Sequence, residues 1–311
     1  MFRTIAEKIK SKKLTKNVLF FANAKIIKKN HTQNIWLIKT FVLPLQILKK
    51  HKMNITQAEN YFLHHIRAIH TKGFHVHSPF LYDLTRNVIY ENNSYYCFAQ
   101  IEQQRHQLLR NHTVIDVTDY GTKPSGKRKI SDIAEVTLAT EKEAQLLFRL
   151  SNYVKAKNIL ELGTSLGIST AYLVMPNSKC RVTTFEGSQN IARQAQNVWK
   201  QLKIQDRIHC IVGNIDNTLQ PFLNHTGKLD LIYIDANHTE EATLKYYKMC
   251  LPHVNENAIM IFDDIYLNKG MAQAWQTIKQ QEEVKATIDL YSLGLVFFNK
   301  YLIKQDYRMI F

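Results

Sequence analysis

Short apolar runs alternate with helically spaced apolar positions over the second half of the chain, and this alternation predicts an α/β fold. Runs of strand length occupy residues 159–162, 181–185, 208–212, 229–234 and 258–262. Helical spacing occupies residues 141–156, 189–202, 240–250 and 271–281. Strands that alternate with helices in this way build a mostly parallel sheet. Ligands bind outside the carboxyl ends of such strands.

The last part of the chain has a different pattern. Residues 285–290 and 295–299 flank a turn at 292–294, which predicts a terminal hairpin, and residues 307–311 fit an additional edge strand. The expected fold class is therefore α/β: a Rossmann-like, seven-stranded, mostly parallel sheet with an antiparallel terminal hairpin, preceded by an N-terminal helical cap.

The segment before the sheet is expected to be mainly helical. Apolar spacing predicts helices over residues 55–69 and 99–110, and Ser78 followed by Pro79 has the composition of a helix start. The basic run 119–129 contains glycine and proline and is predicted to be a flexible loop. Such a loop is either a lid near an active site or a simple linker.

Three further local signals complete this region. Residues 114–117 fit a short strand or an extended segment, and Ser131-Asp132 and Thr140-Glu141 both have the composition of helix starts. We divide the chain into a basic extension (1–52), a helical cap with the lid loop (53–132) and the α/β domain (133–311).

The formal net charge of +15 is concentrated at the N-terminus. Residues 1–52 hold 13 Lys and Arg against one acid, Glu7, so +12 of the charge lies there. Such a segment is a basic arm that touches anionic lipid or nucleic acid, a partner-binding helix, or a stretch absent from the native protein. The abrupt change in composition favours the last interpretation, with Met53 as the native start. Its apolar patches are too short for a membrane span or a signal peptide.

The cysteines bear on the cellular compartment. Cys97, Cys180, Cys210 and Cys250 are widely separated and form no C-x-x-C pair. This spacing argues for a reducing compartment, which we take to be the cytoplasm, and against a disulfide framework or a zinc site. An apolar content of 45% is enough for a sizeable core.

A glycine turn follows the first strand of the α/β region. The run E-L-G-T-S-L-G places Glu161 two residues before Gly163, with Gly167 opening the next helix. It is neither G-x-G-x-x-G nor a phosphate-binding loop, which disfavours a nicotinamide-dependent oxidoreductase. Glu186 ends the next strand, where a Rossmann-like fold holds ribose hydroxyls. Two carboxylates around a glycine turn without a phosphate cradle indicate S-adenosylmethionine as the ligand.

Four motifs carry a family resemblance. The runs L-E-L-G-T-S-L-G-I-S-T, F-E-G-S, D-L-I-Y-I-D-A-N-H and I-M-I-F-D-D-I resemble class I S-adenosylmethionine-dependent methyltransferases, in the branch that includes catechol O-methyltransferase. The resemblance covers roughly residues 158–298. The longer run from residue 75 to the C-terminus resembles bacterial methyltransferases of unassigned substrate, many from Bacteroidetes. Ser165, where many class I enzymes have a second glycine, departs from the pattern.

The resemblance implies a set of cofactor-binding positions. Glu186 would bind the ribose, the turn from Gly163 to Gly167 the methionine end, and Asn214 the adenine side. The full set expected to bind the cofactor is Glu161, Gly163, Thr164, Ser165, Gly167, Glu186, Gly213, Asn214 and Asp235. The methyl acceptor is expected to be a small molecule.

Three carboxylates end neighbouring strands. Asp235, Asp263 and Asp264 are predicted to converge above the sheet, and the resemblance implies that they hold Mg²⁺. The alternative is that one aspartate binds the cofactor amino group and the others cap helices. His238 stands where the related branch has a catalytic lysine, and a histidine can act as a general base. Asp235 and His238 are thus the candidate catalytic residues, unless His238 is a solvent-facing residue at a helix start.

Two classes of function are carried forward. The first is a methyltransferase, most simply one acting on oxygen. The second is a non-catalytic methyltransferase-fold module that docks on nucleic acid or membrane through residues 1–52. No specific nucleic acid is expected for the α/β domain, and a homodimer is one expected assembly.

Overall fold

The computed structural model describes residues 55–121 and 124–311, with side chains from residue 61 onward. The chain divides into two compact units, Met1–Leu63 and His64–Phe311. Of the first unit only residues 55–63 are described, as the beginning of helix α5 (Ile55–Arg67). The predictions for residues 1–52 lie outside the described residues. The second unit contains the sheet and every element discussed below.

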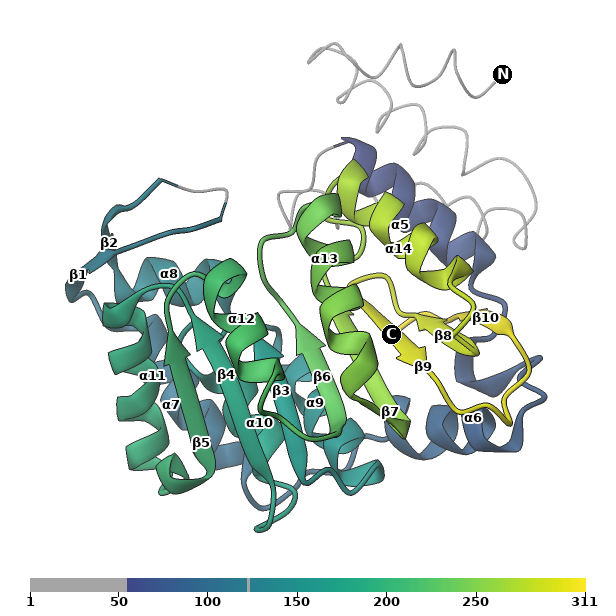
Figure 1. The fold of residues 1–311 in the computed structure, drawn as a ribbon, viewed down its shortest axis with the longest axis horizontal. Helices are drawn as coiled ribbons and strands as arrows, with labels where there is room; N and C mark the ends of the chain where they lie inside the picture. The colour runs from purple at the N-terminus through teal and green to yellow at the C-terminus, as the bar shows by residue number, and fades with distance from the viewer. Residues whose placement is uncertain (1–54, 122–123) are drawn as a thin grey trace, which may run out of the picture. The chain divides into compact units, whose positions relative to one another are not determined.

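An eight-stranded sheet forms the centre of the second unit, with the strand order β10-β8-β9-β7-β6-β3-β4-β5 (Figure 1). Its strands are β3 (Asn158–Leu162), β4 (Arg181–Glu186), β5 (Ile208–Val212), β6 (Leu229–Ile234), β7 (Val254–Asp263), β8 (Ala286–Asp289), β9 (Leu293–Phe297) and β10 (Gln305–Arg308). Strand β9 is antiparallel to both of its neighbours, and the other pairs are parallel. The predicted fold class is confirmed, with β10 as one strand more than the expected seven.

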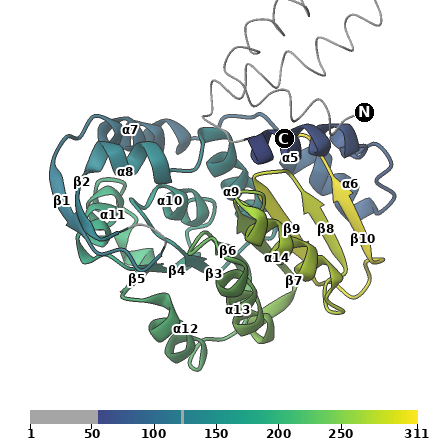
Figure 2. The ribbon, with the colours of Figure 1, turned by 90° about the horizontal axis from the view of Figure 1, so that it is seen from above.

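Helices cover both faces of this sheet (Figures 1 and 2). They are α6 (Pro79–Leu84), α7 (Phe98–Leu109), α8 (Ile130–Thr137), α9 (Glu141–Tyr153), α10 (Ile168–Val174), α11 (Gln189–Gln201), α12 (Ile215–Leu223), α13 (Glu240–Cys250) and α14 (Lys269–Gln280). Among the described residues no helix is long and apolar enough to cross a membrane.

The strands have two apolar faces because successive side chains point to opposite sides of a sheet. Ile159 packs into the core shared with α7, α9, α10 and α11, whereas the next residue, Leu160, packs into the core shared with α12, α13 and α14. This is why the strands appear in the sequence as continuous apolar runs. Figure 2 shows the two helical layers on either side of the sheet.

The order of the strands determines where a ligand can bind. From β3 the chain proceeds outward to β4 and β5, and it then returns to place β6 on the other side of β3. Loops that leave β3 and β6 therefore diverge at the carboxyl edge. This reversal is the usual position of a ligand site in an open α/β sheet.

Several local predictions are confirmed by capping contacts. The Ser78 hydroxyl accepts a hydrogen bond from the Leu81 N–H, with Pro79 in the first turn of α6. Thr140 and Glu143 form a reciprocal capping box at the start of α9. The start predicted at Ser131-Asp132 was wrong by a residue, because α8 begins at Ile130.

Two elements were not predicted. Strand β2 (Gly126–Lys129) lies inside the segment expected to be a flexible loop, and it pairs antiparallel with β1 (Val114–Val117). Helix α12 follows Asn214 directly and contains Pro221. The hairpin strands β8 and β9 are present, but Leu293 and Gly294 belong to β9 and not to the turn.

Candidate active site

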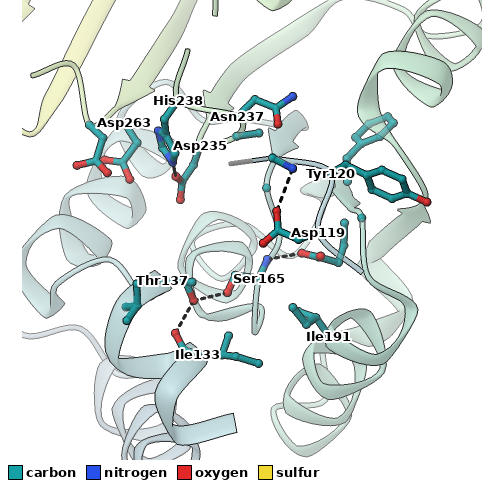
Figure 3. Close-up of a pocket in the computed structure, with 18 of the residues that line it drawn as sticks. Asp119, Tyr120, Ile133, Thr137, Ser165, Ile191, Asp235, Asn237, His238 and Asp263 are labelled. Atoms are coloured by element: carbon teal, nitrogen blue, oxygen red, sulfur yellow. Dashed lines mark hydrogen bonds and ion pairs between the residues drawn. The ribbon is translucent and has the colours of Figure 1, made fainter. Parts of the chain in front are cut away.

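A cavity of about 690 Å³ opens at the carboxyl edge of the sheet. Its walls come from the loops after β3, β4, β5, β6 and β7, from helix α8, and from the β1–β2 ribbon. Figure 3 shows Asp263 and His238 on one side of this cavity and Tyr120 on the other. The predicted strand-end residues are thus brought together, as expected from the topology.

The glycine turn after β3 forms the floor of the cavity. Gly163 has a φ of +101°, and a β-carbon there would lie 2.0 Å from the backbone carbonyl oxygen of Asp235. Only glycine permits this close approach of the β3 and β6 ends. Ser165 follows with a φ of +46°, and its hydroxyl lies 2.6 Å from the Thr137 hydroxyl of α8. The turn is therefore held by the end of β6 on one side and by helix α8 on the other.

Glu186 at the end of β4 faces the cavity with a defined orientation. Its two carboxylate oxygens accept hydrogen bonds from the backbone N–H groups of Ser165 and Ser188, both at 2.9 Å. Burial raises the pKa of Glu186 to about 7, although these N–H groups act in the opposite direction. Each oxygen keeps acceptor capacity for a hydroxyl donor. The position and chemistry suit a ribose.

Glu161 occupies a different environment from the one expected of a ligand-contacting residue. Its carboxylate is fully buried below the turn and accepts hydrogen bonds from the hydroxyls of Ser169, Thr170 and Thr184 at 2.5–2.6 Å. Burial raises its pKa to about 7. Glu161 does not line the cavity. Its hydrogen bonds join β3, β4 and α10 beneath the turn, and its contact with the cofactor stays a prediction.

Thr164 and Gly167 also lie outside the cavity lining. The Thr164 hydroxyl contacts the Thr184 hydroxyl at 2.6 Å. Gly167 begins α10 with a φ of +78°, and a β-carbon there would lie 2.5 Å from the Trp199 ring nitrogen. Both residues shape the turn through these contacts, and their contact with the cofactor stays a prediction.

Gly213 and Asn214, after β5, do line the cavity. Gly213 has a φ of +139°, and Asn214 caps helix α12 by accepting a hydrogen bond from the Asp216 N–H at 2.9 Å. The Asn214 side-chain oxygen is thus engaged by its own helix.

Asp235 and His238 form a pair on the loop after β6. The His238 Nε2 atom lies 3.3 Å from an Asp235 carboxylate oxygen, and both side chains are partly open to the cavity. The Tyr233 hydroxyl lies 3.4 Å from the other oxygen of Asp235. Asn237 and His238 both have positive φ values, 64° and 29°. Strained backbone of this kind is concentrated at functional sites.

Asp263 and Asp264 line the same side of the cavity. Burial, together with Asp235 and the neighbouring aspartate, holds the pKa of Asp263 well above its ordinary value; burial also raises that of Asp264, to about 6. However, the described part of the chain contains no group of three His, Cys, Asp or Glu side chains placed to hold a metal ion. The three aspartates share the cavity, and their role as a Mg²⁺ ligand set stays a prediction.

Sequence reasoning missed the contribution of the ribbon. Asp119, Tyr120 and Arg128 line the cavity although they precede the glycine turn by more than 30 residues. The only signal in the sequence was the predicted loop near the site. Among the described lining residues Arg128 is the sole Lys or Arg, against the acids Asp119, Asp132, Glu143, Glu186, Asp235, Asp263 and Asp264.

Comparison with known proteins agrees with this geometry. Residues 160–265 match a family model described as a methyltransferase domain. This segment is a class I S-adenosylmethionine-dependent methyltransferase domain, and it is similar in sequence to O-methyltransferases. The match spans the loops after β3, β4, β5 and β6, which bring Glu186, Asn214 and Asp235 to the cavity.

Individual relatives support the same family. A catechol O-methyltransferase of Mycobacterium tuberculosis is 26% identical over 144 residues, covering 45% of this chain and 64% of that protein. The mouse catechol O-methyltransferase domain-containing protein 1 is 28% identical over 127 residues, covering 40% of this chain and 48% of that protein. The chain therefore spans less than two thirds of these relatives' length.

A solved structure supports the fold. The S-adenosylhomocysteine-bound methyltransferase PaMTH1 of Podospora anserina superimposes with a TM-score of 0.51 at 16% identity, covering 71% of this chain and 96% of that protein. At this identity the likeness concerns the arrangement of the methyltransferase sheet and its helices.

Proposed function

We propose that this protein transfers the methyl group of S-adenosylmethionine to a hydroxyl oxygen of a small molecule. The observation that carries the proposal is that Glu186, at the end of β4, and the Asp235–His238 pair, after β6, line one cavity from strands on either side of β3, whose glycine turn lies between them. One side suits a nucleoside, and the other offers a base. Sequence similarity to O-methyltransferases supports the choice of oxygen as acceptor atom.

In the proposed complex the cofactor binds along the carboxyl edge of the sheet. Glu186 accepts the ribose hydroxyls, and Ser165 and the backbone around Gly163 contact the methionine end. Gly213 and Asn214 border the adenine side. The acidic lining suits S-adenosylmethionine, because its sulfonium and ammonium groups are cationic.

The proposed reaction is a single in-line displacement. The acceptor oxygen attacks the methyl carbon, the carbon–sulfur bond breaks as the carbon–oxygen bond forms, and S-adenosylhomocysteine leaves. His238, oriented by Asp235, takes the proton of the acceptor hydroxyl. Positioning of the two reactants contributes much of the rate.

A divalent cation is a separate part of the proposal. Its support is that Asp235, Asp263 and Asp264 all line one cavity, and carboxylate oxygens are ligands that suit Mg²⁺. Mg²⁺ bound by these carboxylates and Asp235 would hold the acceptor hydroxyl and lower its pKa. Calorimetric titration of the protein with Mg²⁺ tests this part. If the titration shows no heat of binding and EDTA leaves the turnover rate unchanged, no divalent cation takes part in the reaction.

Binding of S-adenosylhomocysteine tests the central proposal. The wild-type protein should bind it in calorimetry, Glu186→Ala should lose at least about tenfold in affinity, and Glu256→Gln, an exposed glutamate at the start of β7, should match the wild type. A wild-type protein that does not bind S-adenosylhomocysteine would exclude the proposed activity.

A further inference from the structure

The β1–β2 ribbon crosses the cavity from one strand-end loop to another. At one end the Thr118 N–H points to the Ser188 hydroxyl, after β4, at 3.4 Å. At the other end Gly121 approaches Asn237, after β6, since a β-carbon there would lie 3.3 Å from the Asn237 side-chain oxygen. Strand β3 lies between β4 and β6. Residues 118–121 therefore pass above the glycine turn.

The ribbon is attached to the rest of the domain by specific contacts. The Asn190 side chain of α11 donates a hydrogen bond to the Asp116 carbonyl at 2.8 Å. Arg128 donates two hydrogen bonds to one oxygen of Asp119, at 3.1 and 3.2 Å. The other oxygen of Asp119 accepts from the Gly121 N–H at 2.9 Å. These contacts fix residues 118–121 as a wall of the cavity.

Within this wall Tyr120 packs against Gly187. A β-carbon on Gly187 would lie 2.9 Å from the Tyr120 ring, which is closer than real β-carbons come. Gly187 directly follows Glu186, so the ring packs on the residue next in the chain to the one proposed to hold the ribose. Tyr120 is nevertheless 52% exposed as a residue. An aromatic ring that is held on one side and open on the other is a surface available to a ligand.

We infer that Tyr120 is a nucleoside-contacting residue of the cofactor site, with its ring seated on Gly187 as the wall beside the ribose. The inference rests on the proposed cofactor site and adds a residue from outside the matched methyltransferase segment. The ring contributes by stacking and by excluding water from the ribose hydroxyls and Glu186, whereas its hydroxyl is not required. Gly187 contributes by having no side chain that would displace the ring.

Calorimetry with S-adenosylhomocysteine and with adenosine tests this inference on four variants. Tyr120→Ala should weaken both ligands by about tenfold, the scale of a lost aromatic contact with a nucleoside, and Tyr120→Phe should stay within about twofold of the wild type. Gly187→Ala should weaken S-adenosylhomocysteine several-fold, and it should add little in the Tyr120→Ala background because the clashing ring is gone. Tyr301→Ala, at a tyrosine 81% exposed and outside the cavity lining, is the matched control.

The outcomes separate this inference from the proposed function. If the wild type binds S-adenosylhomocysteine and Tyr120→Ala binds it equally well, the inference is wrong and the proposed function stands. If Gly187→Ala weakens binding equally in both backgrounds, the residue acts directly on the ligand and the proposed ring contact is wrong. If the wild type binds neither ligand, the proposed function and this inference both fail. Unchanged melting temperatures of the unliganded variants would show that a loss of affinity is not caused by a loss of folding stability.

Discussion

The backbone carbonyl oxygen of Asp235 lies 2.0 Å from the position that a β-carbon would take on Gly163. The two strand ends therefore touch through a backbone contact that any side chain at residue 163 would prevent. Because Asp235 belongs to the proposed catalytic pair, the position of that pair depends on this glycine.

Gly163→Ala should accordingly damage both stability and binding. The new methyl group meets backbone that cannot rotate away, at a φ that alanine rarely adopts, so we expect a loss of about 2–4 kcal/mol in the free energy of unfolding. Urea unfolding and calorimetry with S-adenosylhomocysteine measure the two effects. Gly227→Ala is the matched control, since nothing lies within 4 Å of a β-carbon there; equal stability of the two variants would contradict the argument.

Cofactor affinity should rise with pH up to about pH 7 and then level off. The pKa of Glu186 is raised to about 7, and hydroxyl donors prefer the ionised carboxylate. Below that pH the Glu186 carboxyl group is protonated and must lose its proton before the ribose binds. The affinity for the cofactor therefore falls by up to tenfold per pH unit below that value. Calorimetry at pH 5.5–8.5, chosen as roughly one and a half units either side, measures the slope. Glu186→Gln should flatten it; an unchanged slope would assign the pH dependence to another group.

His238→Gln should separate binding from chemistry. If His238 takes the acceptor proton, turnover should fall by about 10²–10⁴-fold, whereas affinity for S-adenosylhomocysteine should stay within about twofold because His238 makes none of the proposed cofactor contacts. Formation of S-adenosylhomocysteine by mass spectrometry, with a panel of hydroxyl-bearing acceptors, gives the rate. A parallel loss of cofactor affinity would instead make His238 part of the cofactor site.

The C-terminal edge of the sheet should depend on Asp289. Its carboxylate pairs with His64 at 3.2 Å and accepts from the Tyr266 hydroxyl at 2.6 Å and from Arg308 at 3.3 Å. Burial by itself raises its pKa, but these partners, with His64 first, lower it to about 2. The stabilisation is therefore complete above the unfolded value of about 4 and is lost as pH falls through about 2.

Asp289→Asn should thus reduce the free energy of unfolding by about 2 kcal/mol at pH 7. Guanidinium unfolding at pH 7 and near pH 4 should show the full difference at both values. Asp206→Asn removes an exposed aspartate and should leave stability unchanged. A similar loss in both variants would mean that the Asp289 partners contribute nothing specific.

The sequence predicted the central strands because their apolar runs are buried on both faces, as at Ile159 and Leu160. It missed α12, where Pro221 and a short polar stretch hide the helical spacing. It also missed β2, whose residues are mostly exposed and become a strand only by pairing with β1. A helix or strand could be predicted where buried positions repeat regularly along the sequence. It could not be predicted where pairing with a distant segment alone determines the structure.

The same distinction applies to the site. Strand ends identified Glu186, Asp235 and Asp263, because topology forces them to one edge. Sequence position could not reveal that the Glu161 side chain is enclosed by three hydroxyls. Sequence position also could not show that Tyr120 lines the cavity, because no local pattern indicates which distant segment will pass over it.

The β1–β2 ribbon has a consequence for the choice of fragments of this protein for expression. A fragment beginning at β3 would keep the whole segment that matches the methyltransferase family, residues 160–265, yet it would lack Asp119 and Tyr120. Such a fragment would keep the walls made by the loops after β4 to β7 but would leave a bound ligand open to solvent where residues 117–121 lie. Gene boundaries drawn by family similarity alone would therefore cut away one side of the pocket they were meant to preserve.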